Sequence, residues 1–173
     1  MKDGKVTIIG KGDGWDKAPT EGECWGVTQL NLRRPVTRVI DMNDYSLWGE
    51  VEAREALESR QKALDDNIPY IDLMSYPLRK IVDYFGTDYF SNTVDYTLAM
   101  AIYEGFKEID LYGVNMAVDS EYAYQKPGVD FWCGVALGKG IKVNVHGKES
   151  TIMLTQTGFL YGYKYPQRGL ICR

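Results

Sequence analysis

The sequence predicts an α/β fold, namely a three-layer, Rossmann-like single domain with a mostly parallel sheet and helices on both faces. Short β-branched apolar runs alternate with segments of helical periodicity along the chain, as parallel βαβ units do. The 173 residues are 45% hydrophobic and 25% charged, which suits one sizeable soluble core. No internal repeat or low-complexity linker divides them. We therefore expect one domain over residues 1–173.

Apolar runs that stop at glycine or at polar residues predict the strands. The first is "KVTIIG", whose β-branched residues are closed by Gly10. Five more runs of this kind predict strands at 24–30, 37–42, 68–74, 107–116 and 141–147. The tail after residue 150 has the composition of extended or hairpin structure.

Helical spacing of apolar residues predicts four helices between these strands, at 47–67, 76–86, 91–106 and from near Pro127 to Gly138. The third has the clearest ends, because Ser91 or Asn92 can cap its start and Gly105 can close it. A tyrosine-rich loop, with Tyr122 and Tyr124, is expected before the last helix.

Composition excludes several classes of protein. The net charge is −4 and the basic residues are scattered, which argues against a nucleic-acid partner. No apolar run approaches the roughly 20 residues that span a bilayer, and the N-terminus has no leader pattern. We expect a cytoplasmic protein with no membrane partner. The odd cysteine count, without a CxxC spacing, predicts three reduced thiols at Cys24, Cys133 and Cys172.

The carboxyl ends of parallel strands meet at one sheet edge, where α/β proteins bind ligands. Strand ends and the helix start at 91 place glycines, hydroxyls and amides there, and a helix start attracts anions. The tyrosine-rich loop can cover a ligand. We therefore predict a ligand site built by Gly10, Gly12, Asp13, Gly14, Thr28, Ser91, Asn92, Thr93, Asn115, Tyr122 and Tyr124.

Carboxylates near the same edge predict a Mg²⁺ site, with Asp13 and Asp41 as ligands. Asp41, Asp44 and His146 are the candidate catalytic residues, and His146 is the only histidine in the chain. Each signal has a plainer alternative. Glycine loops are often bare turns, Ser-Asn-Thr is an ordinary helix cap, aspartates end turns, and His146 can be a packing residue. The loop matches neither a Rossmann fingerprint nor a Walker A motif.

Two stretches together resemble a known family. "TIIGKGDGW" is similar to the strand-GxGPS opening of the MptE-like superfamily, which includes 6-hydroxymethylpterin diphosphokinases and motility accessory factors. "SNTVDYTLAMAIYEGFKEIDLYGVNM" resembles its second signature, and a related pattern occurs in bacterial sialyltransferases that use a CMP-linked sugar. The resemblance covers about 5–45 and 88–118. Small members of this kind also look like phage-encoded proteins.

This resemblance implies that the first loop and the helix start hold the phosphates of a nucleotide or nucleotide-sugar. Asp13 and Asn115 depart from the family pattern, which usually has proline and aspartate at those positions. The predicted function is a Mg²⁺-assisted transferase of the diphosphokinase or glycosyltransferase type. The alternative is a protein that binds or sequesters a nucleotide-like ligand without turnover. A third possibility is a homo-oligomeric scaffold whose tyrosines make subunit contacts.

Overall fold

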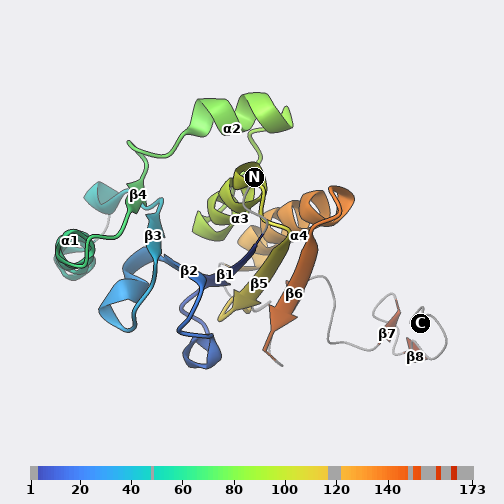
Figure 1. Ribbon diagram of the computed structural model, residues 1–173, viewed down its shortest axis with the longest axis horizontal. Coiled ribbons are helices and arrows are strands. Elements are labelled where there is room, and N and C mark those ends of the chain that lie inside the picture. The colour runs from blue at the N-terminus through green and yellow to red at the C-terminus, as the bar shows by residue number, and fades with distance from the viewer. Residues whose placement is uncertain are drawn as a thin grey trace.

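The strands form a six-stranded, all-parallel sheet in the order β4-β3-β2-β1-β5-β6 (Figure 1). The computed structural model describes residues 4–47, 49–116, 122–147, 150–152, 159–160 and 165–166. The strands are β1 (Lys5–Ile9), β2 (Glu23–Val27), β3 (Arg38–Asp41), β4 (Tyr70–Asp72), β5 (Glu108–Tyr112) and β6 (Lys142–His146). A separate antiparallel pair joins β7 (Phe159–Leu160) to β8 (Tyr165–Pro166), a hairpin pairing of the kind expected in the tail.

Helices lie on both faces of the sheet, which confirms the predicted fold class. They are α1 (Glu50–Asp65), α2 (Leu78–Phe85), α3 (Thr93–Glu104) and α4 (Tyr122–Gly138). Three 3₁₀ segments add η1 (Trp15–Lys17), η2 (Thr28–Leu32) and η3 (Tyr45–Leu47). In Figure 1, α3 and α4 pack behind β1, β5 and β6, while α1 stands at the β4 end of the sheet.

Successive side chains of a strand point to opposite faces of the sheet, and this divides the hydrophobic core into two clusters. Ile8 on β1 and Leu111 on β5 are fully buried in the larger cluster with α3 and α4. Ile9 and Val39 point to the opposite face and pack in a smaller cluster with Leu30 of η2. Side chains one position apart on a strand face opposite sides, so strands such as β1 and β3 supply both clusters. The strands are therefore buried on both faces over β1 to β3.

The structure corrects two predicted elements. The second strand ends at Val27 rather than residue 30, because Thr28 takes a positive φ of 51° and starts η2. Tyr122 and Tyr124 do not lie in a loop, since they form the first turn of α4 and Pro127 lies inside that helix. Pro127 is the sixth residue of α4, so it removes one N–H donor from the helical hydrogen-bond ladder just after the first turn.

The described part of the chain bears on two expectations drawn from the composition, one about membrane-spanning helices and one about the cysteines. There, no helix has the length and apolarity needed to cross a bilayer. Cys24 and Cys133 are buried and form no disulfide, as expected for reduced thiols. Burial raises the pKa of the Cys133 thiol to about 12, which makes it unreactive at neutral pH. Cys172 lies outside the described residues.

Candidate functional site

The strand order reverses between β1 and β5, and a cleft of about 840 Å³ lies beyond their carboxyl ends. The chain builds the sheet outward from β1 to β4 and then returns to place β5 on the other side of β1. Open α/β sheets bind their ligands beyond the carboxyl ends of the strands at such a switch point. The cleft therefore lies where a doubly wound fold is expected to bind its ligand.

Most of the predicted ligand residues lie together in this cleft. Its lining includes Gly10, Gly12, Asp13, Thr28, Ser91, Asn92, Thr93, Asn115 and Tyr122. Gly14 does not line it, because this residue has turned away at a φ of 90° to cap η1. Tyr124 does not line it either, and its side chain is 86% exposed on α4. The sequence thus located the cleft, while the ligand roles of these residues remain predictions.

The glycines of the first loop have a packing role. A Cβ on Gly10 or Gly12 would overlap the carbonyl oxygen of Gly113, in the loop after β5. The N–H of Gly10 donates to the Tyr112 carbonyl at 2.8 Å, and that of Gly12 donates to the Gly113 carbonyl at 2.9 Å. Gly113 itself has a φ of 63°. The two loops are therefore interlocked through backbone contacts, and these two N–H groups are already used.

The start of α3 is also occupied by the protein's own groups. The Asn92 side chain accepts hydrogen bonds from the N–H of Val94 at 2.8 Å and from that of Asp95 at 3.2 Å. Its amide nitrogen donates to the carbonyl of Gln125 in α4 at 3.2 Å. Ser91 donates to the Asp95 carboxylate at 2.8 Å. Asn92 thus caps the helix and ties it to α4, which weakens its expected role as a phosphate ligand.

Aromatic and amide side chains also line the cleft. Phe90 and Tyr96 are stacked with ring centroids 4.2 Å apart, and both line the cleft. Asn115 places its Oδ1 atom in a buried position without a hydrogen-bond partner among the described residues. A buried acceptor of this kind costs free energy until a donor reaches it. The Phe90 ring is also stacked on Trp132, so Tyr96 is the ring of this pair that is left to meet a ligand, and the Asn115 amide beside it has an oxygen without a donor.

Charge in the cleft is sparse. Among the described lining residues, Lys11 is the only cation and Asp13 the only anion. Partial burial, assisted by the nearby Arg33, lowers the pKa of Lys11.

Thr28 and Met116 also line the cleft and have positive φ values of 51° and 50°, which non-glycine residues rarely adopt. Backbone strain of this kind is concentrated at functional sites in proteins.

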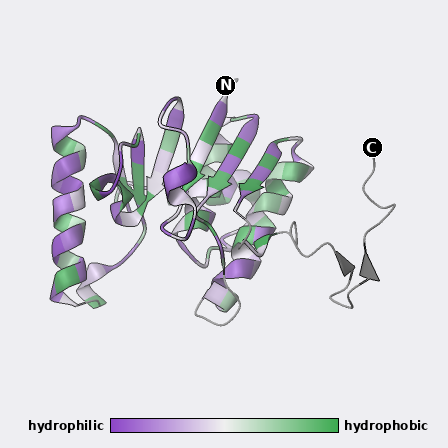
Figure 2. Ribbon diagram, turned by 90° about the horizontal axis from the view of Figure 1, so that it is seen from below, coloured by the Kyte–Doolittle hydropathy of each residue, from purple (hydrophilic) through white to green (hydrophobic). Residues whose placement is uncertain are grey.

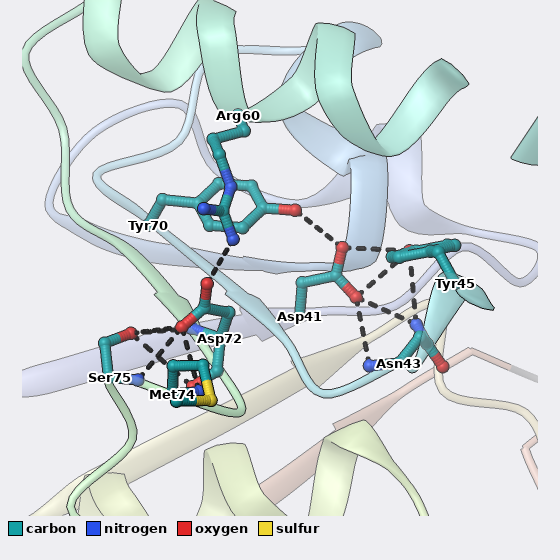
Figure 3. Close-up of polar contacts among 8 residues, drawn as sticks. All are labelled: Asp41, Asn43, Tyr45, Arg60, Tyr70, Asp72, Met74 and Ser75. Carbon is teal, nitrogen blue, oxygen red and sulfur yellow. Dashed lines mark hydrogen bonds and ion pairs between the residues drawn. The ribbon is translucent and has the colours of Figure 1, made fainter. Parts of the chain in front are cut away.

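Asp41 lies in a second, smaller pocket of about 300 Å³ beneath α1 (Figure 3). Its carboxylate accepts hydrogen bonds from the hydroxyls of Tyr45 at 2.9 Å and Tyr70 at 2.7 Å, and from the Asn43 amide at 2.9 Å. Asn43 lines both cavities, whereas Asp13 lines only the cleft. Asp41 is 2% exposed, and its oxygens are committed to these donors.

This geometry does not fit the predicted magnesium site. Asp13 and Asp41 line different cavities, and the hydrogen bonds to Asp41 occupy the lone pairs that a metal would need. Across the described ranges, no group of three or more histidine, cysteine, aspartate or glutamate side chains could hold a metal ion.

Asp44 and His146, the other predicted catalytic residues, also lie outside the cleft lining. Asp44 accepts hydrogen bonds from the N–H and hydroxyl of Ser46, which lower its pKa and identify it as a turn residue. His146 ends β6, where it stacks on Tyr112 at 4.1 Å and places Nε2 3.5 Å from an Asp110 oxygen. Both have structural roles in these positions.

Several lining residues were not among the sequence candidates, notably Lys11, Phe90, Tyr96 and Gln125. Lys11 had a usable signal, because it is a cation between two loop glycines. Phe90 immediately precedes the predicted helix start, and Tyr96 lies one turn into that helix. Gln125 was missed because the helical start of α4 was read as a loop.

No protein-family model and no curated protein matches the chain. Among solved structures, the chain is similar to the sialyltransferase CstII from Campylobacter jejuni in complex with the substrate analogue CMP-3FNeuAc, with 13% identity, a TM-score of 0.42, and coverage of 86% of this chain and 83% of that chain. It is also similar to an α-2,3-sialyltransferase from Campylobacter jejuni in apo form, with 14% identity, a TM-score of 0.45, and coverage of 88% and 77%. TM-scores below 0.5 do not establish a shared function.

Proposed function

We propose that the protein binds a nucleotide or nucleotide-sugar in the switch-point cleft and acts as a transferase of the glycosyltransferase type. One observation carries the proposal. At the point where α/β folds bind ligands, a single cleft combines the Lys11 cation, the Tyr96 ring and the Asn115 amide, whose oxygen has no partner among the described residues. The Tyr96 ring can pack on a base, and the Asn115 side chain can hydrogen-bond a ligand hydroxyl or amine once it turns toward the cleft.

Lys11 is the group that we assign to the ligand's phosphate. In a transfer reaction, an acceptor hydroxyl would attack the anomeric carbon and give its proton to Asp13 or to water. The bond from that carbon to the phosphate oxygen would break, and the nucleotide would leave with that oxygen. Lys11 would neutralise the charge that grows on the leaving phosphate. Such chemistry depends on positioning and charge neutralisation, so it needs no covalent nucleophile on the protein.

Binding without turnover is the second candidate function. The lining residues in the described part of the chain include no histidine, glutamate or cysteine, and Asp13 is their only carboxylate. A general base for the acceptor hydroxyl is therefore limited to Asp13 within that part. This observation favours a protein that sequesters or senses the ligand.

Calorimetric titration of the purified chain tests the binding step. Nucleoside 5′-mono- and diphosphates and their sugar-linked forms serve as probes, each with and without EDTA. We expect at least one probe to bind in the presence of EDTA, and Lys11→Met to weaken it roughly ten- to hundredfold, through loss of a charged contact. Lys17→Met, which changes an exposed lysine of η1 outside the cleft, is the matched control.

Absence of binding by every probe, or equal losses in the two lysine variants, would remove the assignment. Turnover then separates the two candidate functions. Release of free nucleotide from a bound nucleotide-sugar, faster than in the absence of protein, identifies a transferase or hydrolase. Recovery of the intact probe after prolonged incubation identifies a binding protein.

A further inference from the structure

A continuous line of hydrogen bonds joins the cleft to the pocket beneath α1. Lys11 Nζ donates to Gln29 Oε1 at 2.9 Å, and Gln29 Nε2 donates to the Tyr45 hydroxyl at 2.6 Å. The Tyr45 hydroxyl donates to the Asp41 carboxylate, 2.9 Å from Oδ2 and 3.0 Å from Oδ1. The four residues come from the loop after β1, from η2, from η3 and from the end of β3. We call them the Lys11–Asp41 chain.

The Asp41 carboxylate, at the buried end of the Lys11–Asp41 chain, determines which group donates and which accepts in each of its hydrogen bonds. An ionised carboxylate only accepts, so the Tyr45 hydroxyl must donate to Asp41. The Tyr45 oxygen then accepts from the Gln29 amide nitrogen, and this sets which way the Gln29 amide faces. Gln29 Oε1 is left directed at Lys11, whose ammonium only donates. Reversing the Gln29 amide would place its NH₂ group against the ammonium and lose both bonds.

Burial makes this arrangement costly to disturb. Asp41 and Gln29 are 2% and 6% exposed. The hydrogen-bonding partners of the Asp41 carboxylate are two phenols and the side-chain amide and backbone N–H of Asn43, all neutral, as Figure 3 shows. Burial and the Asp41 charge both raise the pKa values of Tyr45 and Tyr70, so the two phenols stay protonated and continue to donate. A donor or acceptor left without a partner in such a buried network destabilises the folded state.

We propose that Asp41 is a positioning residue for the cleft, which acts through Tyr45 and Gln29 to hold the Lys11 ammonium on the β2–β3 side of the cleft wall. This inference deepens the proposed function, because it states which side of the site receives the ligand's negative group. An anion that contacts Lys11 there lies beside Thr28 and Asn43, the lining residues that follow β2 and β3. Asp41 contributes to the site without contacting the ligand.

The two tyrosines on Asp41 provide a matched pair of variants. Tyr45→Phe and Tyr70→Phe each remove one hydroxyl that donates to the Asp41 carboxylate. Only Tyr45 lies between Asp41 and Lys11. A purely structural role for these hydroxyls predicts similar effects of the two changes on thermal stability and on Lys11. The Lys11–Asp41 chain predicts similar losses of stability but an effect on Lys11 from Tyr45→Phe alone.

The measurement is the titration of Lys11 itself, by NMR of the protein carrying ¹³C-methylated lysines, with Lys11→Arg to assign its signal. The groups that act on Lys11 are Arg33, which lowers its pKa, and Glu55 and Asp41, which raise it. We expect Tyr45→Phe to lower the Lys11 pKa by about half a unit or more, through loss of the oriented acceptor. Asp41→Asn should lower it further, and Tyr70→Phe should leave it unchanged.

Equal Lys11 pKa values in the wild type and in Tyr45→Phe would overturn the inference, as would equal shifts in the two tyrosine variants. If Asp41→Asn does not fold, the tyrosine pair still decides the question. The readout needs no ligand, so its outcome is distinct from that of the proposed function. Where a nucleotide probe does bind, the affinity should fall severalfold in Tyr45→Phe and remain unchanged in Tyr70→Phe.

Discussion

Helices α3 and α1 flank the same sheet but are held to it by different forces. Helix α3 buries most of its length, with Leu98 fully inaccessible in the larger core. Helix α1 buries only Ala56, Ser59 and Ala63 and contacts mainly η2. Figure 2 shows α1 at one end of the molecule, with hydrophilic and hydrophobic residues alternating along its ribbon. One side of the fold therefore depends on apolar burial, whereas the other depends on small residues and specific hydrogen bonds.

The cleft and the smaller pocket differ in the same way as the two helices beside them. The cleft lies between the glycine loops and α3, where Asn92 fixes the helix start against α4. The smaller pocket lies under α1, where Asp41 draws two tyrosine hydroxyls and an amide around itself. A buried apolar layer thus supports the site that we assign to the ligand, and a polar network beside it contacts the one cation of that site. The difference gives predictions that can be measured on each side.

The largest expected effect is a leucine truncation compared across the two helices. Leu98→Ala in α3 should lower the free energy of unfolding by about 2 to 5 kcal/mol, since it opens a cavity in the larger core. Leu57→Ala in α1 removes a side chain that is 68% exposed and should change it by less than about 0.5 kcal/mol. Urea denaturation measures both. Similar losses would show that α1 depends on apolar burial as much as α3 does.

The second prediction concerns Asp95, which is buried at the start of α3. Its Oδ1 atom has no hydrogen-bond partner in the described part of the chain. Burial raises the pKa of Asp95 to about 6 from 3.8, against the opposing hydrogen bonds from Ser91. The folded protein therefore binds this proton more tightly than the unfolded chain does. The stabilisation is fully present below about pH 4 and is lost as the pH rises through 6.

Asp95→Asn separates this titration from that of all other groups. Its free energy of unfolding, relative to wild type, should increase by roughly 2 to 3 kcal/mol between pH 4 and pH 7, because only the wild type must keep a buried charge at neutral pH. Denaturation at a series of pH values provides the curve. A difference between the two proteins that does not vary with pH would contradict the assignment.

The smallest effect is expected on the α1 side. Ser59 donates to the Asn31 side chain at 2.5 Å, and the Asn31 amide donates to the Ser59 carbonyl at 2.7 Å. Ser59→Ala leaves a buried acceptor of Asn31 without that donor and should cost about 1 to 2 kcal/mol, measured by thermal or urea denaturation. Ser46→Ala, which removes a hydrogen bond from an exposed turn, is the control and should cost less than about 0.5 kcal/mol.

Much of the fold could be predicted from local sequence. The β-branched run before Gly10 identified the central strand, and the helix start at Ser91 to Thr93 was correctly expected at the same edge. The first turn of α4 was missed because tyrosines and Pro127 interrupt the usual helical pattern. Polar residues near a proline favour a loop when only local preferences are considered.

The direction of side chains could not be predicted in the same way. Lys11 and Gln29 are 18 residues apart, and Gln29 and Tyr45 are separated by 16. Their hydrogen bonds depend on the order of the strands and on the 3₁₀ segments η2 and η3, which no sequence pattern predicted. Asp41 was expected at the sheet edge, yet its carboxylate turned toward tyrosines rather than toward Asp13. Tertiary contacts decide such orientations, because each side chain has several staggered conformations available to it.

The interlocked glycine loops have a consequence for how this fold would diverge in evolution. Because Gly10, Gly12 and Gly113 are required by the close approach of two backbones, selection for folding alone is enough to retain them. A descendant could exchange its ligand, or lose ligand binding altogether, and still carry the same glycine spacing. The spacing would then record ancestry of the scaffold, while the residues between and around the glycines, such as Lys11, would record the change of ligand.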